Sequence, residues 1–393
     1  MNWSERFATR TLRMKPSAIR EILKLTQGGQ VISFAGGLPA PHLFPVEQLR
    51  RAAETVLTQS GREALQYSTT EGYRPLREWV AARLQASAEE VQIVSGSQQA
   101  LDLVAKLFLN PGDTVVVGAP TYVGALRAFD AYEVEYVSVP TDDEGMLPDA
   151  LEAALKTQPK LVYVIPNFDN PTGVTVSLER RRAMVELARR YGVPILEDNP
   201  YGELRFEGAE LPNLYTLAPD VVLYAGTFSK IMVPGFRLAW VLADPQVVTL
   251  LTRAKQATDL HTATYTQMIA FEAAKDRFID AHVLQVRDYY REQRDLMLRA
   301  LAAHMSREVR WTRPAGGMFL WLTLPEDMNA SDIAYDAVQQ NVAYVPGETF
   351  FTDGSSLNTL RLSYSVASAE EIDEGVRRLS GVFKAQLENA RVH

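Results

Sequence analysis

The sequence predicts an α/β fold built on a mostly parallel sheet, followed by a smaller α+β region. Between residues 90 and 245, short runs of β-branched and other apolar residues alternate with helical segments. The runs are continuous rather than alternating, which is typical of strands buried on both faces of a parallel sheet. Ligands of such sheets bind beyond the carboxyl ends of the strands. The residues that follow these runs are therefore the first candidates for a functional site.

The expected elements fall into three regions, because 393 residues exceed the usual size of a single core. Strands are expected at 91–94, 114–117, 161–165, 193–196, 221–224 and 238–241, with helices at 99–109, from about 124, and at 178–191. A charged helical pattern over 264–304 predicts one long helix. Strands at 318–324 and 359–364 and helices at 331–340 and 369–387 follow. We expect an N-terminal arm and lid helix (1–45) packing on the small domain, a large domain (46–290) and a small C-terminal domain (291–393).

Composition excludes several classes of function. The net charge is −8 and no basic run occurs, so nucleic-acid binding is not expected. Cysteine is absent, and the five histidines show no metal-ligand spacing, so we expect neither disulfides nor a metal site. No apolar run approaches about 20 residues, and the first residues lack the apolar core of a signal peptide. We therefore expect a cytoplasmic enzyme without a membrane partner.

The segment 226–237 is the most informative part of the chain. Lys230 follows the hydroxyl residues Thr227 and Ser229, and Arg237 lies seven positions further on. A lysine amine can form a Schiff base with an aldehyde, which is how enzymes hold pyridoxal phosphate. Hydroxyls and a guanidinium are suitable donors for its phosphate ester. The chain has nine lysines against 31 arginines. A solvated lysine in a surface loop is the alternative.

Two further strand ends carry groups that a pyridoxal enzyme needs. Glu197 and Asp198 end one strand on opposite faces, and Tyr201 follows three residues after Asp198, which favours Asp198 as the partner of the pyridine nitrogen. Asn170 lies in an Asn-Pro-Thr-Gly turn after another strand and offers an amide to the phenolic oxygen. Solvated acids at a strand end and a purely structural turn are the alternatives.

The remaining strand ends offer an anion site and an aromatic ring. Ser95-Gly96-Ser97-Gln98-Gln99 joins a strand to a helix, whose free N–H groups together with the Ser97 hydroxyl suit a phosphate. Simple helix capping would also explain these serines. Tyr122 follows the next strand and could stack on the cofactor ring, although core packing would explain a tyrosine equally well.

Taken together, these motifs resemble the fold-type-I pyridoxal-phosphate aminotransferases over nearly the whole chain. The resemblance implies a seven-stranded sheet, Lys230 as Schiff-base lysine and proton-transfer base, Asp198 on the pyridine nitrogen, and Asn170 with Tyr201 on the phenolic oxygen. It also implies that Arg361 binds the substrate α-carboxylate and that Tyr67 reaches the phosphate of a neighbouring subunit in a homodimer with shared active sites. The phosphate itself would be held by Ser97, Gln98, Thr227, Ser229 and Arg237.

Within this family, the runs 17–24 and 33–39 are similar to the 2-aminoadipate and kynurenine aminotransferases. The resemblance implies that Arg20 meets the distal carboxylate of the substrate, and an apolar stripe beside Arg20 permits an inward-facing lid helix. A solvated arginine is the alternative. Gly36 and Gly37 would let the backbone approach the substrate. The expected partners are amino acids (2-aminoadipate, glutamate, leucine or aromatic amino acids) and 2-oxo acids such as 2-oxoglutarate or 2-oxoadipate, in lysine biosynthesis.

Three other functions compete with this interpretation. A transcriptional regulator with an aminotransferase-like domain would need a basic winged-helix domain before the motifs, and the similarity begins near residue 15. A β-lyase or decarboxylase could share the cofactor motifs, so only Arg361 and the subgroup similarity favour transamination. A nicotinamide enzyme is disfavoured because no Gly-x-Gly-x-x-Gly follows a strand.

Overall fold

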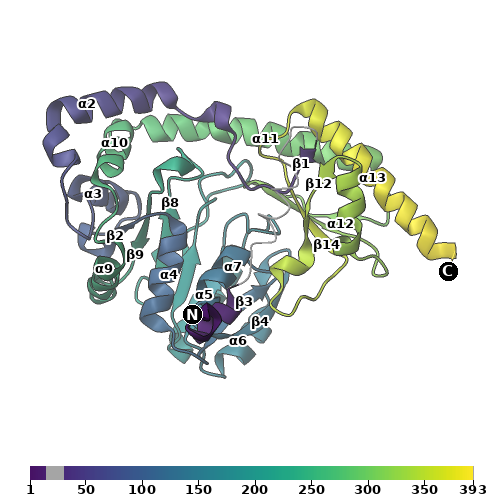
Figure 1. Cartoon of the computed structure of the whole chain (residues 1–393), viewed down its shortest axis with the longest axis horizontal. Helices are drawn as coiled ribbons and strands as arrows, with labels where there is room; N and C mark the ends of the chain where they lie inside the picture. The colour runs from purple at the N-terminus through teal and green to yellow at the C-terminus, as the bar shows by residue number, and fades with distance from the viewer. Residues whose placement is uncertain (15–30, 393) are drawn as a thin grey trace.

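The protein contains a large sheet covered by helices, with a smaller sheet beside it (Figure 1). The computed structural model describes residues 1–14 and 31–392. In spatial order the strands of the large sheet are β2 (Val91–Val94), β9 (Ala239–Leu242), β8 (Val222–Thr227), β7 (Ile195–Asp198), β6 (Leu161–Val164), β3 (Thr114–Ala119), β4 (Glu135–Asp142) and β5 (Gly145–Met146). The pairings from β4 through β3, β6 and β7 to β8 are parallel. Only β9 and the short β5 run against their neighbours. The predicted α/β fold is confirmed.

Seven of these strands make the expected sheet, and the eighth, β5, is a two-residue strand at its edge. Strand β4 is the one long strand without a continuous apolar run. Of its eight residues only Val139 is buried, because β4 lies near the sheet edge and its other residues face solvent in part. A search for continuous apolar runs detects strands buried on both faces and misses such a strand.

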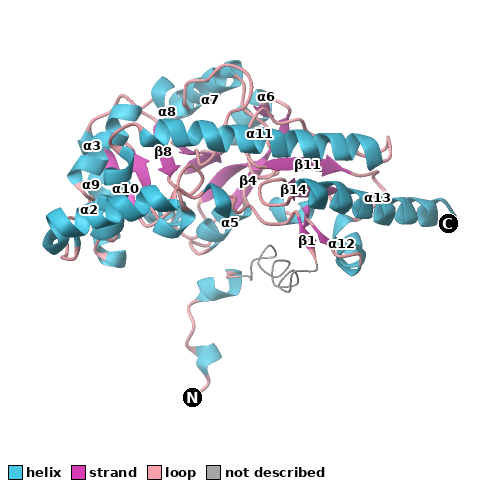
Figure 2. Ribbon diagram, turned by 90° about the horizontal axis from the view of Figure 1, so that it is seen from above, coloured by secondary structure: helices cyan, strands magenta, loops and turns pink. Residues whose placement is uncertain are grey.

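Helices cover both faces of the large sheet. Figure 2 shows α6, α7 and α8 on one side of it and α5 on the other. The helices that belong to this part are α2 (Val46–Ala64), α3 (Arg74–Arg83), α4 (Ser97–Phe108), α5 (Val123–Asp130), α6 (Pro148–Leu155), α7 (Leu178–Tyr191), α8 (Leu214–Leu217), α9 (Pro245–Asp259) and α10 (Thr264–Ala274). As expected, Gly192 ends α7 in the left-handed conformation that glycine adopts without strain.

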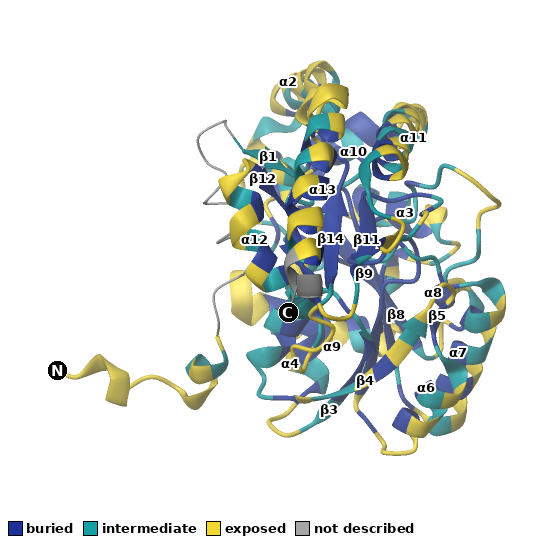
Figure 3. Cartoon of the chain, turned by 90° about the vertical axis from the view of Figure 1, so that its right-hand side faces the viewer, coloured by how far each residue is buried: buried dark blue, intermediate teal, exposed yellow. Residues whose placement is uncertain are grey.

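The C-terminal part contains a second, antiparallel sheet with the order β10 (Arg310–Trp311), β11 (Phe319–Thr323), β14 (Thr359–Ser363) and β13 (Val345–Pro346). Helices α12 (Ala330–Gln339) and α13 (Ala369–Val392) pack beside it. The early strand β1 (Ile32–Ser33) pairs in parallel with β12 (Val342–Ala343). In Figure 3, β11 and β14 lie buried beneath exposed helices. The smaller α+β region is thus present, and the chain before residue 35 reaches it.

The helical stretch from 264 to 304 is two helices rather than one. Helix α10 ends at Ala274 and α11 (Phe278–His304) begins after Arg277, whose positive φ of 62° interrupts the helical backbone. Such a φ is incompatible with a continuous right-handed helix. Helix α11 then continues without interruption past residue 290, so the expected boundary between the two domains falls inside it.

Six short 3₁₀ helices complete the described elements: η1 (Trp3–Glu5), η2 (Thr9–Arg13), η3 (Pro41–Leu43), η4 (Ala88–Glu90), η5 (Pro234–Phe236) and η6 (Gly347–Phe350). The first two lie on an N-terminal arm that extends from the body of the protein (Figure 2). Within residues 1–14 and 31–392, no helix combines the length and the apolar character needed to cross a membrane.

Candidate active site

Lys230 lies in the loop that follows β8, at the carboxyl end of the parallel strands. Its Nζ donates a hydrogen bond to the carbonyl oxygen of Gly37 over 2.8 Å. Burial, together with the positive charges of Arg361 and Arg237, lowers the pKa of the Lys230 amine from 10.5 to about 8. A lysine in this setting holds an unprotonated, nucleophilic amine at a pH where a solvated lysine does not.

The cavity in front of Lys230 has a volume of about 320 Å³ and collects most of the residues that the sequence singles out. Side chains that follow five different strands meet there with side chains from the C-terminal part. The lining includes Gly37, Ser97, Gln98, Tyr122, Asn170, Asp198, Tyr201, Thr227, Ser229, Lys230, Arg237 and Arg361.

Two of the predicted residues that the structure describes are not part of this lining, and a third lies outside the described residues. Gly36 is described by the structure but does not line the cavity, although its neighbour Gly37 does. Tyr67 lies elsewhere on the surface, 78% exposed, with its ring edge-on to His261. Arg20 falls outside the described residues.

Asp198 and Glu197 end strand β7 on opposite faces, and only Asp198 faces the cavity. Its Oδ2 accepts a hydrogen bond from the Tyr163 hydroxyl over 2.9 Å, whereas Oδ1 is buried with no hydrogen-bond partner among the described residues. Burial raises the pKa of Asp198 to about 6, although the Tyr163 bond opposes that rise. A buried carboxylate oxygen without a partner is costly, and a protonated ring nitrogen would satisfy it.

Glu197 serves the other side of the sheet. Its Oε2 accepts the backbone N–H of Tyr215 over 2.8 Å, at the start of α8. Burial raises the pKa of Glu197 to about 7, and the nearby Arg181 lowers it in part. This carboxylate therefore supports packing between the sheet and its helices, away from the cavity.

The amino end of α4 forms an anion cradle with the loop after β8. Gly96 precedes the helix with φ of 92° and no side chain caps the helix, so its first N–H groups remain available. A Cβ atom on Gly96 would lie 2.3 Å from Nη2 of Arg237, so glycine is needed for this close approach. The Thr227 hydroxyl donates to that of Ser229 over 3.0 Å. The cradle thus offers a guanidinium, hydroxyls and helix N–H groups to a phosphate.

Arg361 closes the cavity from the small sheet. Its Nη1 donates to Oδ1 of Asn170 and its Nη2 to the carbonyl oxygen of Ala35, both over 2.6 Å, while Nε is buried without a partner among the described residues. The guanidinium lies 4.3 Å from the centre of the Phe319 ring. Burial lowers the pKa of Arg361 to about 10, so the group stays charged near neutral pH.

These contacts also orient Asn170 and Tyr201. Because Oδ1 of Asn170 accepts from Arg361, its Nδ2 amide group is the part left to donate to a ligand in the cavity. The Tyr201 ring packs edge-on against Phe319 at 5.7 Å. Burial raises the pKa of the Tyr201 and Tyr122 hydroxyls, so both remain protonated donors.

Sequence reasoning missed three residues that shape the site: Tyr163, Phe319 and Arg181. Tyr163 was part of an apolar strand, yet a buried tyrosine hydroxyl needs a partner, and that requirement was the available signal. Arg181 is fully buried and donates to the carbonyls of Pro166 and Val176, which begin and end the loop carrying Asn170. No comparable signal in the sequence indicated that the Phe319 ring lies against Arg361.

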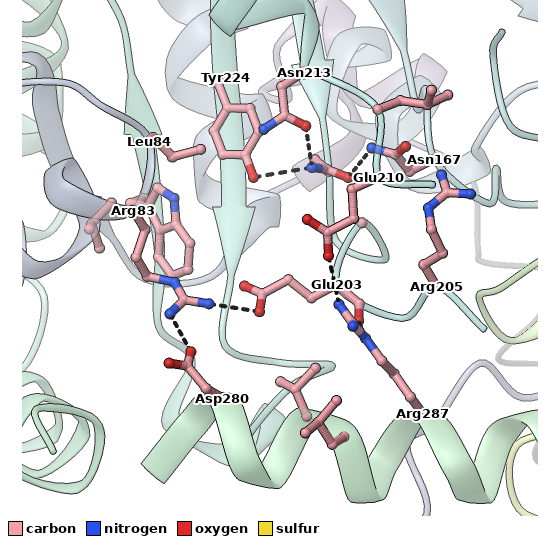
Figure 4. A pocket seen from close by; sticks show the side chains of 17 residues that line it. Arg83, Leu84, Asn167, Glu203, Arg205, Glu210, Asn213, Tyr224, Asp280 and Arg287 are labelled. Carbon is pink, nitrogen blue, oxygen red and sulfur yellow. Dashed lines mark hydrogen bonds and ion pairs between the residues drawn. The ribbon is translucent and has the colours of Figure 1, made fainter. Parts of the chain in front are cut away.

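A second cavity, of about 570 Å³, lies between α3, α11 and the loop after β7 (Figure 4). Most of its charged groups are paired: Arg83 donates to Glu203 and Asp280, and Arg287 lies 3.5 Å from Glu210. Arg205 also lines this cavity, where it donates to the backbone carbonyl of Glu207 and lies over the Phe168 ring. No group of three or more potential metal ligands occurs among the described residues.

Comparison with known proteins places this arrangement in a family. The family model for aminotransferase class I and II matches residues 32–379. The chain belongs to that family. It is 46% identical to the 2-aminoadipate transaminase of Thermus thermophilus over 98% of each chain, and 45% identical to an aromatic-amino-acid aminotransferase of Thermococcus litoralis over 98% of this chain and 96% of that one.

Solved structures agree with this assignment. An α-aminoadipate aminotransferase from Thermus thermophilus, complexed with N-(5'-phosphopyridoxyl)-L-leucine, superposes with a TM-score of 0.94 at 44% identity, covering 99% of this chain and all of the other. The family and the fold expected from the sequence are confirmed. The aminotransferase is a pyridoxal-phosphate-dependent transaminase.

Proposed function

We propose that this aminotransferase transfers the amino group of 2-aminoadipate or glutamate to a 2-oxo acid, with 2-oxoglutarate or 2-oxoadipate as acceptor, in lysine biosynthesis. The name of the Thermus thermophilus relative supports this substrate class. A broader specificity that includes aromatic or branched-chain amino acids is the second candidate, and the name of the Thermococcus litoralis relative favours it. A β-lyase is a third and weaker candidate.

One observation carries the proposal: Arg361, Lys230 and the unpartnered oxygen of Asp198 converge on a single cavity. Arg361 is the natural reader of an α-carboxylate, because a guanidinium binds carboxylates through parallel hydrogen bonds. Its Nε has no partner among the described residues, and its Nη2 contact with Ala35 is to a backbone carbonyl. An amino acid held there would present its α-carbon toward Lys230.

The residues fit pyridoxal phosphate in four ways. Asp198 Oδ1 would accept from the ring nitrogen, Asn170 and Tyr201 would donate to the phenolic oxygen, and Tyr122 would pack on the ring. Ser97, Gln98, Thr227, Ser229 and Arg237 would hold the phosphate. When bound, the cofactor accepts the electron pair released at the substrate α-carbon.

Lys230 then moves the proton. An amine with a pKa of about 8 is partly unprotonated at neutral pH, so it can take a proton from carbon and give it back. Its hydrogen bond to Gly37, which also lines the cavity, fixes the position of Nζ. Gly37 in turn packs closely on Phe319, since a Cβ atom there would lie 2.8 Å from that ring.

A half-reaction tests the chemistry. Incubation of the loaded enzyme with glutamate alone should convert the cofactor to its amino form and release 2-oxoglutarate in equal amount, because a transaminase completes half its cycle without an acceptor. Release of ammonia instead would identify a lyase. A panel of amino-acid donors with 2-oxoglutarate then ranks 2-aminoadipate against leucine and phenylalanine, and equal rates for all would favour the broad-specificity candidate.

A homodimer with shared active sites completes the proposal. Tyr67 is exposed here, as a residue donated to a partner would be, and large apolar side chains are exposed both near it and on the N-terminal arm. They include Trp3, Phe7, Leu12, Leu57 and Leu65. Exposed apolar groups of this size mark interaction surfaces. Light scattering that found a stable, active monomer would contradict the dimer.

The division of the chain into an arm (1–45), a large domain (46–290) and a small domain (291–393) is part of the same proposal. Pairing of β1 with β12 supports the attachment of the arm to the small domain. The cytoplasmic location expected from the sequence stays a prediction.

A further inference from the structure

An ion pair between a buried lysine and a partly exposed aspartate lies next to the anion cradle. Lys255 and Asp259 belong to the last turns of α9, which packs against α4. The Lys255 side chain is fully buried, and its Nζ lies 2.8 Å from Oδ1 and 2.9 Å from Oδ2 of Asp259. Burying the charge of Lys255 is expensive, whereas the Asp259 side chain stays 29% exposed, so the contacts of the lysine are informative.

The hydrogen bonds of this pair hold the Ser95–Gly96 turn, which begins the anion cradle. Gln99 Oε1 accepts from Lys255 Nζ and from the backbone N–H of Ser95, each over 2.7 Å. Asp259 Oδ2 accepts from the Ser95 hydroxyl over 2.9 Å and from Gln99 Nε2 over 2.7 Å. Ser95 immediately precedes Gly96, where Arg237 approaches the backbone. Both the N–H and the hydroxyl of Ser95 are therefore held by the network.

The pair also sets the charge next to the cradle. Asp259 stays ionised: burial opposes its charge, but hydrogen bonds from Lys255 and Gln99 bring its pKa below the ordinary value. A lone carboxylate bonded to Ser95 would repel a phosphate dianion bound at the start of α4. Lys255 cancels that charge with all three of its N–H donors, through Gln99 and both oxygens of Asp259.

We propose that Lys255 is a positioning residue for the cofactor phosphate, which it never touches: through Gln99 and Asp259 it fixes the Ser95–Gly96 turn and neutralises the carboxylate beside it. This inference rests on the proposed role of Ser97, Gln98 and Arg237 as phosphate ligands. It assigns a function to the second buried lysine near the site, distinct from the covalent role of Lys230.

The test compares two probes that bind apoenzyme, pyridoxal phosphate and pyridoxal, by absorbance titration. Both can react with Lys230, but only the first has a phosphate. Lys255→Met should weaken binding of pyridoxal phosphate roughly 5- to 150-fold, the range expected when a hydrogen-bonded charge loses its partner. Affinity for pyridoxal should change less than about 2-fold, because an effect through the phosphate cannot reach it.

A rescue variant provides the sharper test. In the double variant Lys255→Met/Asp259→Asn the unpaired carboxylate is gone, so affinity for pyridoxal phosphate should recover by about 5-fold or more relative to Lys255→Met. If Lys255→Met does not fold, Ser95→Ala decides instead, since it removes only the hydroxyl that joins the turn to Asp259. Ser95→Ala should lower affinity for pyridoxal phosphate alone.

Two controls separate the possible failures. Arg294 is a buried cation in an ion pair with Glu207 and Asp295, outside the cavity lining. Arg294→Met should leave the ratio of the two affinities unchanged. Arg237→Gln should lower affinity for pyridoxal phosphate selectively; if it does not, the phosphate cradle itself is misassigned. Equal weakening of both probes by folded Lys255→Met, or no weakening of either, would overturn the role of Lys255.

Discussion

Raising the pH through about 8 should switch on the reactivity of Lys230 in the cofactor-free enzyme. The pKa of this amine falls from 10.5 to about 8, chiefly through burial and then through the charges of Arg361 and Arg237. Near pH 7, roughly one-tenth of the Lys230 amines would be unprotonated, on the order of 300 times the fraction expected for an ordinary lysine. Below the folded pKa this advantage stays constant, and above about pH 10.5 it disappears.

A pulse of acetic anhydride at a series of pH values, followed by peptide mass spectrometry, measures this reactivity lysine by lysine. Half-maximal labelling of Lys230 should fall near pH 8, and the exposed lysines of the same chain provide the internal reference. Arg361→Gln should move the Lys230 midpoint upward, because it removes a nearby positive charge. A Lys230 midpoint equal to that of the exposed lysines would refute the reasoning.

Three further predictions follow from the site. Borohydride reduction of the loaded enzyme should attach the cofactor to Lys230 and no other lysine, and Lys230→Ala should abolish both this label and turnover. Asp198→Asn should lower kcat roughly 10- to 150-fold by removing a charged hydrogen bond, whereas Glu197→Gln should be mild; equal losses would leave Asp198 unsupported. Arg20→Ala should lower kcat/KM for 2-aminoadipate roughly 10- to 200-fold and spare leucine, while a uniform loss would indicate a structural role.

Local rules predicted the strand ends well, because each depends on neighbouring residues only. Alternation along a strand separates Asp198 from Glu197 without any tertiary information. Continuous apolar runs located the buried strands, and the glycine after Tyr191 located a helix end. The cavity therefore contains nearly all of the residues expected from those turns.

Contacts between distant parts of the chain could not be predicted in this way. Lys255 and Gln99 are 156 positions apart, and Arg361 and Asn170 are 191 apart. The sequence does not predict either pair. A buried polar group needs a partner, but the neighbouring residues do not indicate which distant residue that partner is. The break between α10 and α11 was also missed, because the residue with the positive φ is Arg277 and not a glycine, which would have indicated a helix end.

The hydrogen bond between Arg361 and Asn170 joins the two sheets of the molecule. Asn170 follows β6 of the large sheet, whereas Arg361 lies on β14 of the small one. Lys230, Asp198 and the phosphate cradle all belong to the large sheet and its loops. In the function proposed above, the groups that would hold the cofactor and the arginine that would bind the α-carboxylate therefore belong to two structural units. Because every amino acid carries an α-carboxylate, this division separates cofactor binding from a contact that is common to all amino-acid substrates.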